Sequence, residues 1–280
     1  MVLCRKTAQD RKADINELVA TMDRESLNAR FTLIHALMLR DMKTRFGGSY
    51  LGYLVAIAWP LTHLVAIVVI SGYVNRIIMV GGDPEVFIAT GVAPYILCLY
   101  PARLMGYAIE LNKPLFLFPI VRPIDLIVSR AIIEFLTAFV VIAIFTAAAY
   151  MYGIEILPMN YETGATALLA IVYFGVSVGI LSTIISSLFK FWHILIIVIM
   201  LILYMTAGVL LPPSAVPPQV QEWLWYNPIF QCVEWLRSAY YEGYGDTYLS
   251  KTYLMSLASV CLFLGLLGER YVRGMLLSSK

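Results

Sequence analysis

The sequence predicts an all-α membrane protein with six transmembrane helices and an amphipathic helix before the first of them. Hydrophobic residues make up 60% of the 280 residues and charged residues only 14%, a balance that no soluble domain of this length needs. Uncharged stretches long enough to span a membrane, roughly 20 residues each, recur along the chain. No internal repeat and no soluble segment interrupts them, so we expect one helical membrane domain behind a short tail.

The first predicted element is an amphipathic interface helix over residues 31–46. Its apolar residues recur at helical spacing, whereas Arg40, Asp41 and Lys43 fall on the opposite face. Such a helix lies on a membrane surface, and the glycines at 47–48 would turn it into the first span. Residues 1–30 are charged and lack the apolar core of a cleavable signal peptide, so we expect them to form a cytoplasmic tail.

The six spans follow from runs with few charges. We place them at residues 51–74, 86–109, 124–152, 166–188, 194–211 and 253–271. Pro94 and Pro101 predict a kink in the second span. Prolines at 212, 213, 217 and 218 end the fifth span and open an external segment over residues 212–250.

The distribution of basic residues predicts the orientation. All but three of the 20 lysines and arginines lie before the first span, around the connections from span two to span three and from span four to span five, or at the end of the chain. The exceptions are Arg76, Arg237 and Lys251. Basic residues remain on the cytoplasmic side, so both termini are expected in the cytoplasm. The net charge of +2 indicates no nucleic-acid partner.

No motif for catalysis is present. The sequence lacks the G-x-x-x-x-G-K-[ST] loop that holds nucleotide phosphates, and its three histidines have no zinc-site spacing. We therefore expect no catalytic residue, no metal and no cofactor in this chain. Arg130 and Glu134, one helical turn apart, are expected to form a local ion pair more readily than a proton pathway. We therefore interpret the chain as a transport conduit that another polypeptide drives.

Two groups of aromatic residues are candidate functional positions. In the first span, Trp59 and His63 share a face with Tyr53, where they either line a path or pack. The external segment carries a dense aromatic group that includes Trp223, Trp225, Tyr226, Phe230 and Trp235. An aromatic belt at the membrane interface is one interpretation. Recognition of sugar rings is the other, with Gln221, Asn227 and Gln231 matching sugar hydroxyls.

Several short motifs, taken in order, resemble the permease subunits of ABC-2-type exporters, with the closest likeness to those that export capsular polysaccharide and with the O-antigen permeases as near relatives. The motifs are residues 39–46 followed by 51–54 and Trp59-Pro60, residues 112–119 followed by 122–125, residues 211–214, and residues 226–228 followed by Glu234 and Arg237. The resemblance covers residues 31–280. The first thirty residues match no pattern of the family.

The resemblance implies a homodimeric permease in a bacterial inner membrane, bound to two copies of a separate ATPase subunit that holds ATP and Mg²⁺. Periplasmic and outer-membrane export proteins are further candidate partners, and membrane lipid surrounds the dimer. The external segment would contain re-entrant helices that form a gate. Coupling to the ATPase would fall to Arg40, Lys43, Arg45, Asn112, Lys113, Leu115 and Phe116, and the substrate path to Tyr53, Trp59, His63, Trp223, Trp225, Tyr226, Phe230 and Trp235.

The expected function is therefore ATP-driven export of a lipid-linked capsular polysaccharide. Three alternatives of the same fold are an O-antigen, a teichoic-acid and a small-lipophile exporter. A more distant alternative is a membrane enzyme that acts on lipid-linked glycans. The enzyme would need carboxylates or histidines gathered at one membrane face, whereas the external acidic residues are scattered over three loops.

Overall fold

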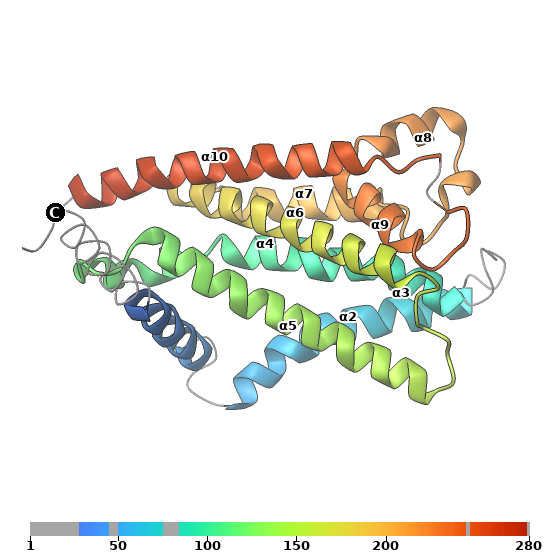
Figure 1. Ribbon diagram of the computed structural model, residues 1–280, viewed down its shortest axis with the longest axis horizontal. Helices are drawn as coiled ribbons and strands as arrows, with labels where there is room; N and C mark the ends of the chain where they lie inside the picture. The colour runs from blue at the N-terminus through green and yellow to red at the C-terminus, as the bar shows by residue number, and fades with distance from the viewer. Residues whose placement is uncertain (1–27, 45–49, 75–83, 245–246, 279–280) are drawn as a thin grey trace, which may run out of the picture.

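The computed structural model describes residues 28–44, 50–74, 84–244 and 247–278, and the regular elements in these ranges are helices (Figure 1). An N-terminal helix over residues 28–44 precedes the rest. The following elements are α2 (Tyr50–Val74), α3 (Pro84–Pro94), η1 (Tyr95–Leu99), α4 (Tyr100–Met105), η2 (Glu110–Leu117), α5 (Pro123–Met151), α6 (Tyr161–Leu188), α7 (Trp192–Met205), η3 (Pro213–Ala215), α8 (Pro218–Trp225), α9 (Pro228–Arg237) and α10 (Lys251–Ser278).

Five helical stretches in the described ranges are long and apolar enough to cross a membrane. They are Tyr53–Gly72, Pro84–Met105, Pro123–Met151, Tyr161–Leu188 and Lys251–Gly274. They correspond to five of the six predicted spans. The remaining one corresponds to α7, which is apolar but only 14 residues long. It ends early because Gly208 adopts a left-handed conformation at φ 70° and Pro212 follows closely, and neither is compatible with a continuing helix.

The second predicted span is interrupted where its prolines indicated a kink. Residues Tyr95–Leu99, between Pro94 and Pro101, form a π-helical segment that joins α3 to α4. A proline lacks the amide hydrogen that an α-helix requires, and wider turns of this kind occur often at functional sites. The chain leaves this span at Gly106, earlier than predicted, and continues into the 3-10 helix η2.

The long helices run alongside one another, and their connections gather at two ends (Figure 1). We call one the basic end: it holds the N-terminal helix, η2, the turn at residues 189–191 between α6 and α7, and the end of α10. The other, the aromatic end, holds α8, α9 and the loops at residues 152–160, 238–244 and 247–250. The span Pro84–Met105 lies at the centre, with 78% of its most apolar window buried, against 22% for α2 and for α10.

Small residues on α6 allow close packing against the central span. A side-chain carbon added at Gly175 would lie 3.1 Å from the backbone of Cys98 in η1, so glycine allows this close approach without displacing the neighbouring helix. About three turns further along α6, Ser186 donates a hydrogen bond to the carbonyl of Gly106 at 2.6 Å. On its other side α6 packs against α10, where Gly265 approaches Ile180.

Local sequence signals begin two of the helices near the aromatic end. The side chain of Asn160 accepts a hydrogen bond from the amide of Thr163 and starts α6. Asn227 accepts one from the amide of Ile229 and starts α9, with Pro228 at its first position. Both are favoured arrangements for a helix N-terminus.

Several sequence predictions lie outside the described residues. These are residues 1–27 of the tail, Arg45 and the glycine turn at 47–48. Within the described part, the N-terminal helix begins at residue 28, a little before the predicted residue 31.

Candidate functional site

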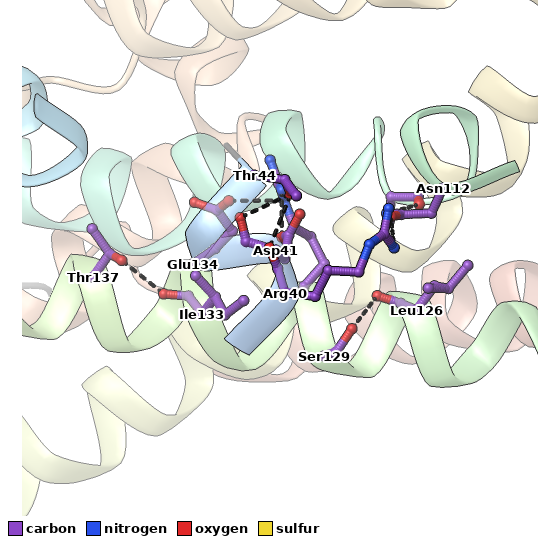
Figure 2. A network of polar contacts seen from close by, with 11 residues as sticks. Arg40, Asp41, Thr44, Asn112, Leu126, Ser129, Ile133, Glu134 and Thr137 are labelled. Atoms are coloured by element: carbon purple, nitrogen blue, oxygen red, sulfur yellow. Dashed lines mark hydrogen bonds and ion pairs between the residues drawn. The ribbon is translucent and has the colours of Figure 1, made fainter. Parts of the chain in front are cut away.

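A buried polar network fastens the N-terminal helix to α5 at the basic end. Arg130 of α5 donates to Asp41 of the N-terminal helix at 2.6 Å, and its Nε lies 3.0 Å from Glu134 one turn further along α5. Figure 2 shows Asp41 directly over α5 beside Glu134. Arg130 and Glu134 thus form an ion pair, and Asp41 is a second carboxylate that sequence reasoning missed because 89 residues separate it from Arg130.

The same N-terminal helix reaches the connection between α4 and α5. Arg40 donates to the side chain of Asn112 at 2.8 Å, while Asn112 itself donates to the carbonyl of Ala108 (Figure 2). Nearer its start, Arg30 forms an ion pair with Asp125 at 2.9 Å. Two of the predicted coupling residues, Arg40 and Asn112, are therefore in direct contact, and the helix and the connection form one unit.

The apolar residues of η2 divide into two groups. Leu115 and Phe116, the predicted coupling residues, are half-buried, and Phe116 packs against a core cluster that includes Met105 and Ile127. Four other apolar side chains in and near η2 are exposed to solvent, namely those of Leu111, Leu117, Phe118 and Ile120. Leu117 is the most exposed of them, at 76%. Lys113 is also exposed. The surface available for a partner is thus shifted from Leu115 and Phe116 towards Leu117 and Phe118.

The turn between α6 and α7 joins the same end of the bundle. His193 lies 2.7 Å from Glu110 of η2, and its ring stacks on Tyr107 with the ring centres 4.0 Å apart. Trp192 donates to Ser182 of α6 at 2.9 Å. Helix α7 is therefore attached directly to η2, a connection that no motif in the sequence signalled.

The structure places His63 in a cluster of polar aromatic side chains that are partly or fully buried. Its ring centre lies 5.4 Å from that of Tyr95, 6.1 Å from that of Tyr100 and 5.7 Å from that of Tyr204. The rings of Tyr95 and Tyr204 are 4.3 Å apart. None of these three tyrosines was predicted from the sequence as a site residue. The signal that could have found them is a tyrosine in the middle of an uncharged span.

A cavity of about 290 Å³ lies between α2, α4 and α5, one turn closer to the basic end. Trp59 borders it and is 69% exposed. Tyr53 lies beside it, with its hydroxyl 3.4 Å from that of Thr137, a lining residue. Of the three predicted path residues in α2, Trp59 thus faces this inner cavity, while Tyr53 and His63 contact its surroundings.

At the aromatic end, the predicted path residues separate into two groups. Trp223, Trp225 and Tyr226 line an external cavity of about 760 Å³ together with Tyr248. Phe230 and Trp235 are instead buried within the core, because they lie on the face of α9 that packs against the bundle. Only the first three face open space.

The side-chain amides of the external segment form hydrogen bonds within the protein. Asn227 donates to the carbonyl of Leu203, and Gln231 donates to the carbonyls of Trp225 and Tyr248. Gln221 likewise donates to two backbone carbonyls, at Pro213 and Val216. These side chains satisfy buried backbone groups, so sugar hydroxyls have no free amide there to bind.

Arg237 fixes α9 to the remainder of the bundle. Its guanidinium is fully buried, donates to the carbonyls of Gly208, Val209 and Phe87 at 2.8–3.0 Å, and lies 3.5 Å over the Phe87 ring. A side-chain carbon at Gly91 would come within 2.7 Å of the guanidinium, so glycine is needed there. The motif residue Arg237 thus joins three segments of the aromatic end.

Glu234 lies one turn before Arg237 on α9, outside the five long spans. Burial raises the pKa of its carboxyl to about 7, and the nearby charge of Arg237 opposes this rise only in part. The burial of Arg237 also lowers the pKa of its guanidinium. The aromatic end therefore holds a titratable group whose charge changes near neutral pH.

A helical membrane bundle with polar aromatic residues around internal and external cavities has the features of a membrane transport protein. The sequence profile of the ABC-2 type transporter family matches residues 32–241, and the chain belongs to this family. It is the membrane component of an ABC transporter, a class that works with an ATPase.

Curated relatives are similar over most of their length. The polysialic acid transport protein KpsM of Escherichia coli is 29% identical over 245 residues, which cover 88% of this chain and 95% of the relative. The capsule polysaccharide export inner-membrane protein CtrC of Neisseria meningitidis serogroup B is 25% identical over 246 residues, covering 86% of this chain and 91% of that protein.

Proposed function

We propose that this protein is the permease subunit of an ABC transporter that exports a lipid-linked capsular polysaccharide across a bacterial inner membrane. The relatives named for capsule export and polysialic acid transport support this substrate class. The observation that carries the proposal is the succession of polar aromatic groups along the bundle. Trp59 borders the inner cavity, the His63 cluster follows one turn on, and Trp225 lines the external cavity.

This arrangement suits a carbohydrate. Aromatic faces pack against the apolar faces of sugar rings, while hydroxyl groups such as those of Tyr95 and Tyr100 exchange hydrogen bonds with sugar hydroxyls. Helices α8 and α9 act as re-entrant gate helices over the outer end of this path, and α7 completes a sixth span.

The basic end is the docking side for two ATPase subunits, which hold ATP and Mg²⁺. Exposed Leu117 and Phe118 form the apolar part of that surface, and exposed Lys113 adds charge. Exposed apolar groups of this kind on a cytoplasmic connection mark a protein contact. The N-terminal helix transmits movement because Arg40 and Asp41 fasten it to both η2 and α5. Both termini lie in the cytoplasm.

The permease functions as a homodimer. The exposed face of α2, with Leu54, Val55 and Trp59, is the face that a second copy covers, so the inner cavity lies near the contact between the two copies.

Deletion of the gene tests the proposal. The deletion strain should lose surface capsular polysaccharide and accumulate it inside the cell, and a plasmid copy should restore export. Undiminished surface polysaccharide in the deletion strain would refute the function.

A further inference from the structure

Arg103 of α4 is a half-buried cation at the inner cavity. Its side chain lines the cavity, and its Nε is shielded from solvent and has no hydrogen-bond partner in the part of the chain that the structure describes. The Nε atoms of Arg130 and Arg237 likewise lack a hydrogen-bond partner. Their terminal nitrogens, however, donate to oxygens at 2.6 and 2.8 Å, as does that of Arg40 at 2.8 Å. Of these four arginines, Arg103 is the one whose N–H groups are left to bind a ligand.

The cavity around Arg103 is built to hold an amphipathic molecule. Apolar residues supply most of the wall, namely Val55, Ala56, Pro60, Ile96, Leu104 and Ala138. Tyr100 and Thr137 contribute hydroxyl groups, and Trp59 adds an aromatic ring beside them. An apolar lining with a few convergent polar groups is typical of a binding site for a small ligand or for part of a larger one.

The carboxylate of Glu134 also lines the cavity. Glu134 lies 3.0 Å from the Nε of Arg130, which in turn is held by Asp41. Glu134 is therefore held by an ion pair to Arg130, a cation that it shares with Asp41, on the side of the cavity that carries the N-terminal helix. No ion pair joins Arg103 to another residue in the described ranges, so its guanidinium remains available for an anion.

We propose that this cavity binds an oxyanion, a phosphate or a carboxylate, carried by the transported glycan or by its lipid anchor, with Arg103 as the anion-binding residue. The planar guanidinium matches two oxygens of such a group. A charge buried in apolar surroundings is unfavourable unless it is paired, and ionisable residues within membrane segments mark substrate pathways. The proposal rests on the function proposed above and identifies which part of the substrate is recognised.

The test is a binding measurement on the full permease purified with its ATPase, using native mass spectrometry. Farnesyl phosphate serves as the anionic lipid probe, farnesol as its uncharged match, and phosphatidylglycerol as an ordinary membrane anion. We expect the unchanged protein to prefer farnesyl phosphate over both. Arg103→Ala should weaken binding of farnesyl phosphate by about tenfold or more, the usual size of a charged hydrogen bond.

Two further variants keep the test decisive. Arg103→Lys retains the charge but not the paired donors, so it should bind about threefold to tenfold more weakly than the unchanged protein. If Arg103→Ala fails to assemble, the affinity of Arg103→Lys for farnesyl phosphate decides the test. Arg270→Ala removes an exposed arginine on α10 and should leave binding unchanged. Equal affinity in the Arg103 variants and the unchanged protein would overturn the proposal. A preference for phosphatidylglycerol that depends on Arg103 would also overturn it, because the site would then hold an ordinary lipid headgroup.

The export assay on the deletion strain separates this inference from the proposed function. Continued export without the gene would refute the function, whatever the binding result. Loss of export together with unchanged binding in both Arg103 variants would refute only the role of the cavity.

Discussion

The aromatic rings of Trp59 and Trp225 should contribute to transport through stacking on sugar rings. Trp59→Ala and Trp225→Ala should each reduce surface polysaccharide about twofold to tenfold, since one aromatic contact is worth roughly 0.5–1.5 kcal/mol. Trp59→Phe, which retains a ring, should preserve most export. Quantitative staining of surface polysaccharide, normalised to the amount of permease in the membrane, gives the measurement.

The control for the tryptophan variants is Phe263→Ala on α10. Phe263 is an aromatic residue of a span with 66% exposure, and it borders none of the cavities described above. Export should be unchanged in this variant. A reduction that merely follows a lower protein level in Trp59→Ala and Trp225→Ala would identify both residues as packing elements.

The carboxyl of Glu234 should make stability depend on pH. Its pKa is raised to about 7 in the folded protein, from an ordinary value of 4.5, so the folded state binds this proton more tightly than the unfolded state. The resulting stabilisation is fully present below pH 4.5 and is lost as the pH rises through 7. The melting temperature of the purified protein should therefore be lower at pH 8 than at pH 6, by a few degrees.

Glu234→Gln removes the titration while keeping the side-chain shape. Its melting temperature should change less between pH 6 and pH 8 than that of the unchanged protein. Glu155→Gln, at an exposed position of the same end, should retain the full dependence. Identical pH dependence in all three proteins would show that Glu234 does not titrate as described.

At the residue scale, individual site residues could be predicted from the sequence more readily than the residues that they contact. The proximity of Arg130 and Glu134 follows from helical spacing alone, and their ion pair is present. Asp41 and the tyrosines around His63 come from distant segments, and helix packing rather than spacing brings them together. Asn227 and Gln231 were assigned to sugars because the sequence does not reveal which amides satisfy buried carbonyls.

At the scale of elements, the exposed apolar part of the segment after Asn112 should bind the ATPase. Leu117→Glu combined with Phe118→Glu should reduce the amount of ATPase that co-purifies by tenfold or more, because an unpaired charge in an apolar contact is unfavourable by several kcal/mol. Phe116→Glu should act differently and lower the level of the permease itself, since Phe116 packs against the core.

Met159→Glu provides the matched control for this surface. Met159 is 71% exposed and lies in the loop before α6 at the opposite end of the molecule. The ATPase should co-purify with this variant in normal amount. Normal co-purification with the Leu117 and Phe118 double variant would place the docking surface elsewhere.

The helices themselves were largely predictable. Runs of uncharged residues located α2, α5, α6 and α10, and the two prolines located the interruption of the central span. The length of α7 was overestimated because an apolar run continues past its last turn. Its early end depends on the conformation of Gly208, which hydrophobicity does not encode.

At the scale of the whole molecule, the orientation in the membrane should follow the basic residues. Ile120 and Met159 are both exposed, and the connections that contain them, after η2 and before α6, lie at opposite ends of the bundle (Figure 1). In intact cells whose outer membrane is permeable to the reagent, Met159→Cys should react with an impermeant thiol reagent and Ile120→Cys should not. Opening the inner membrane should make both react. The reverse pattern would invert the proposed topology.

The central claim is that this chain and a partner ATPase together move a capsular glycan across a membrane. The most direct measurement uses proteoliposomes that contain both subunits and a labelled lipid-linked capsular polysaccharide added outside. With ATP, the glycan should become protected from an added glycosidase, and a non-hydrolysable ATP analogue should give no protection. Protection that is equal without ATP, or equal in vesicles that lack this chain, would contradict the claim.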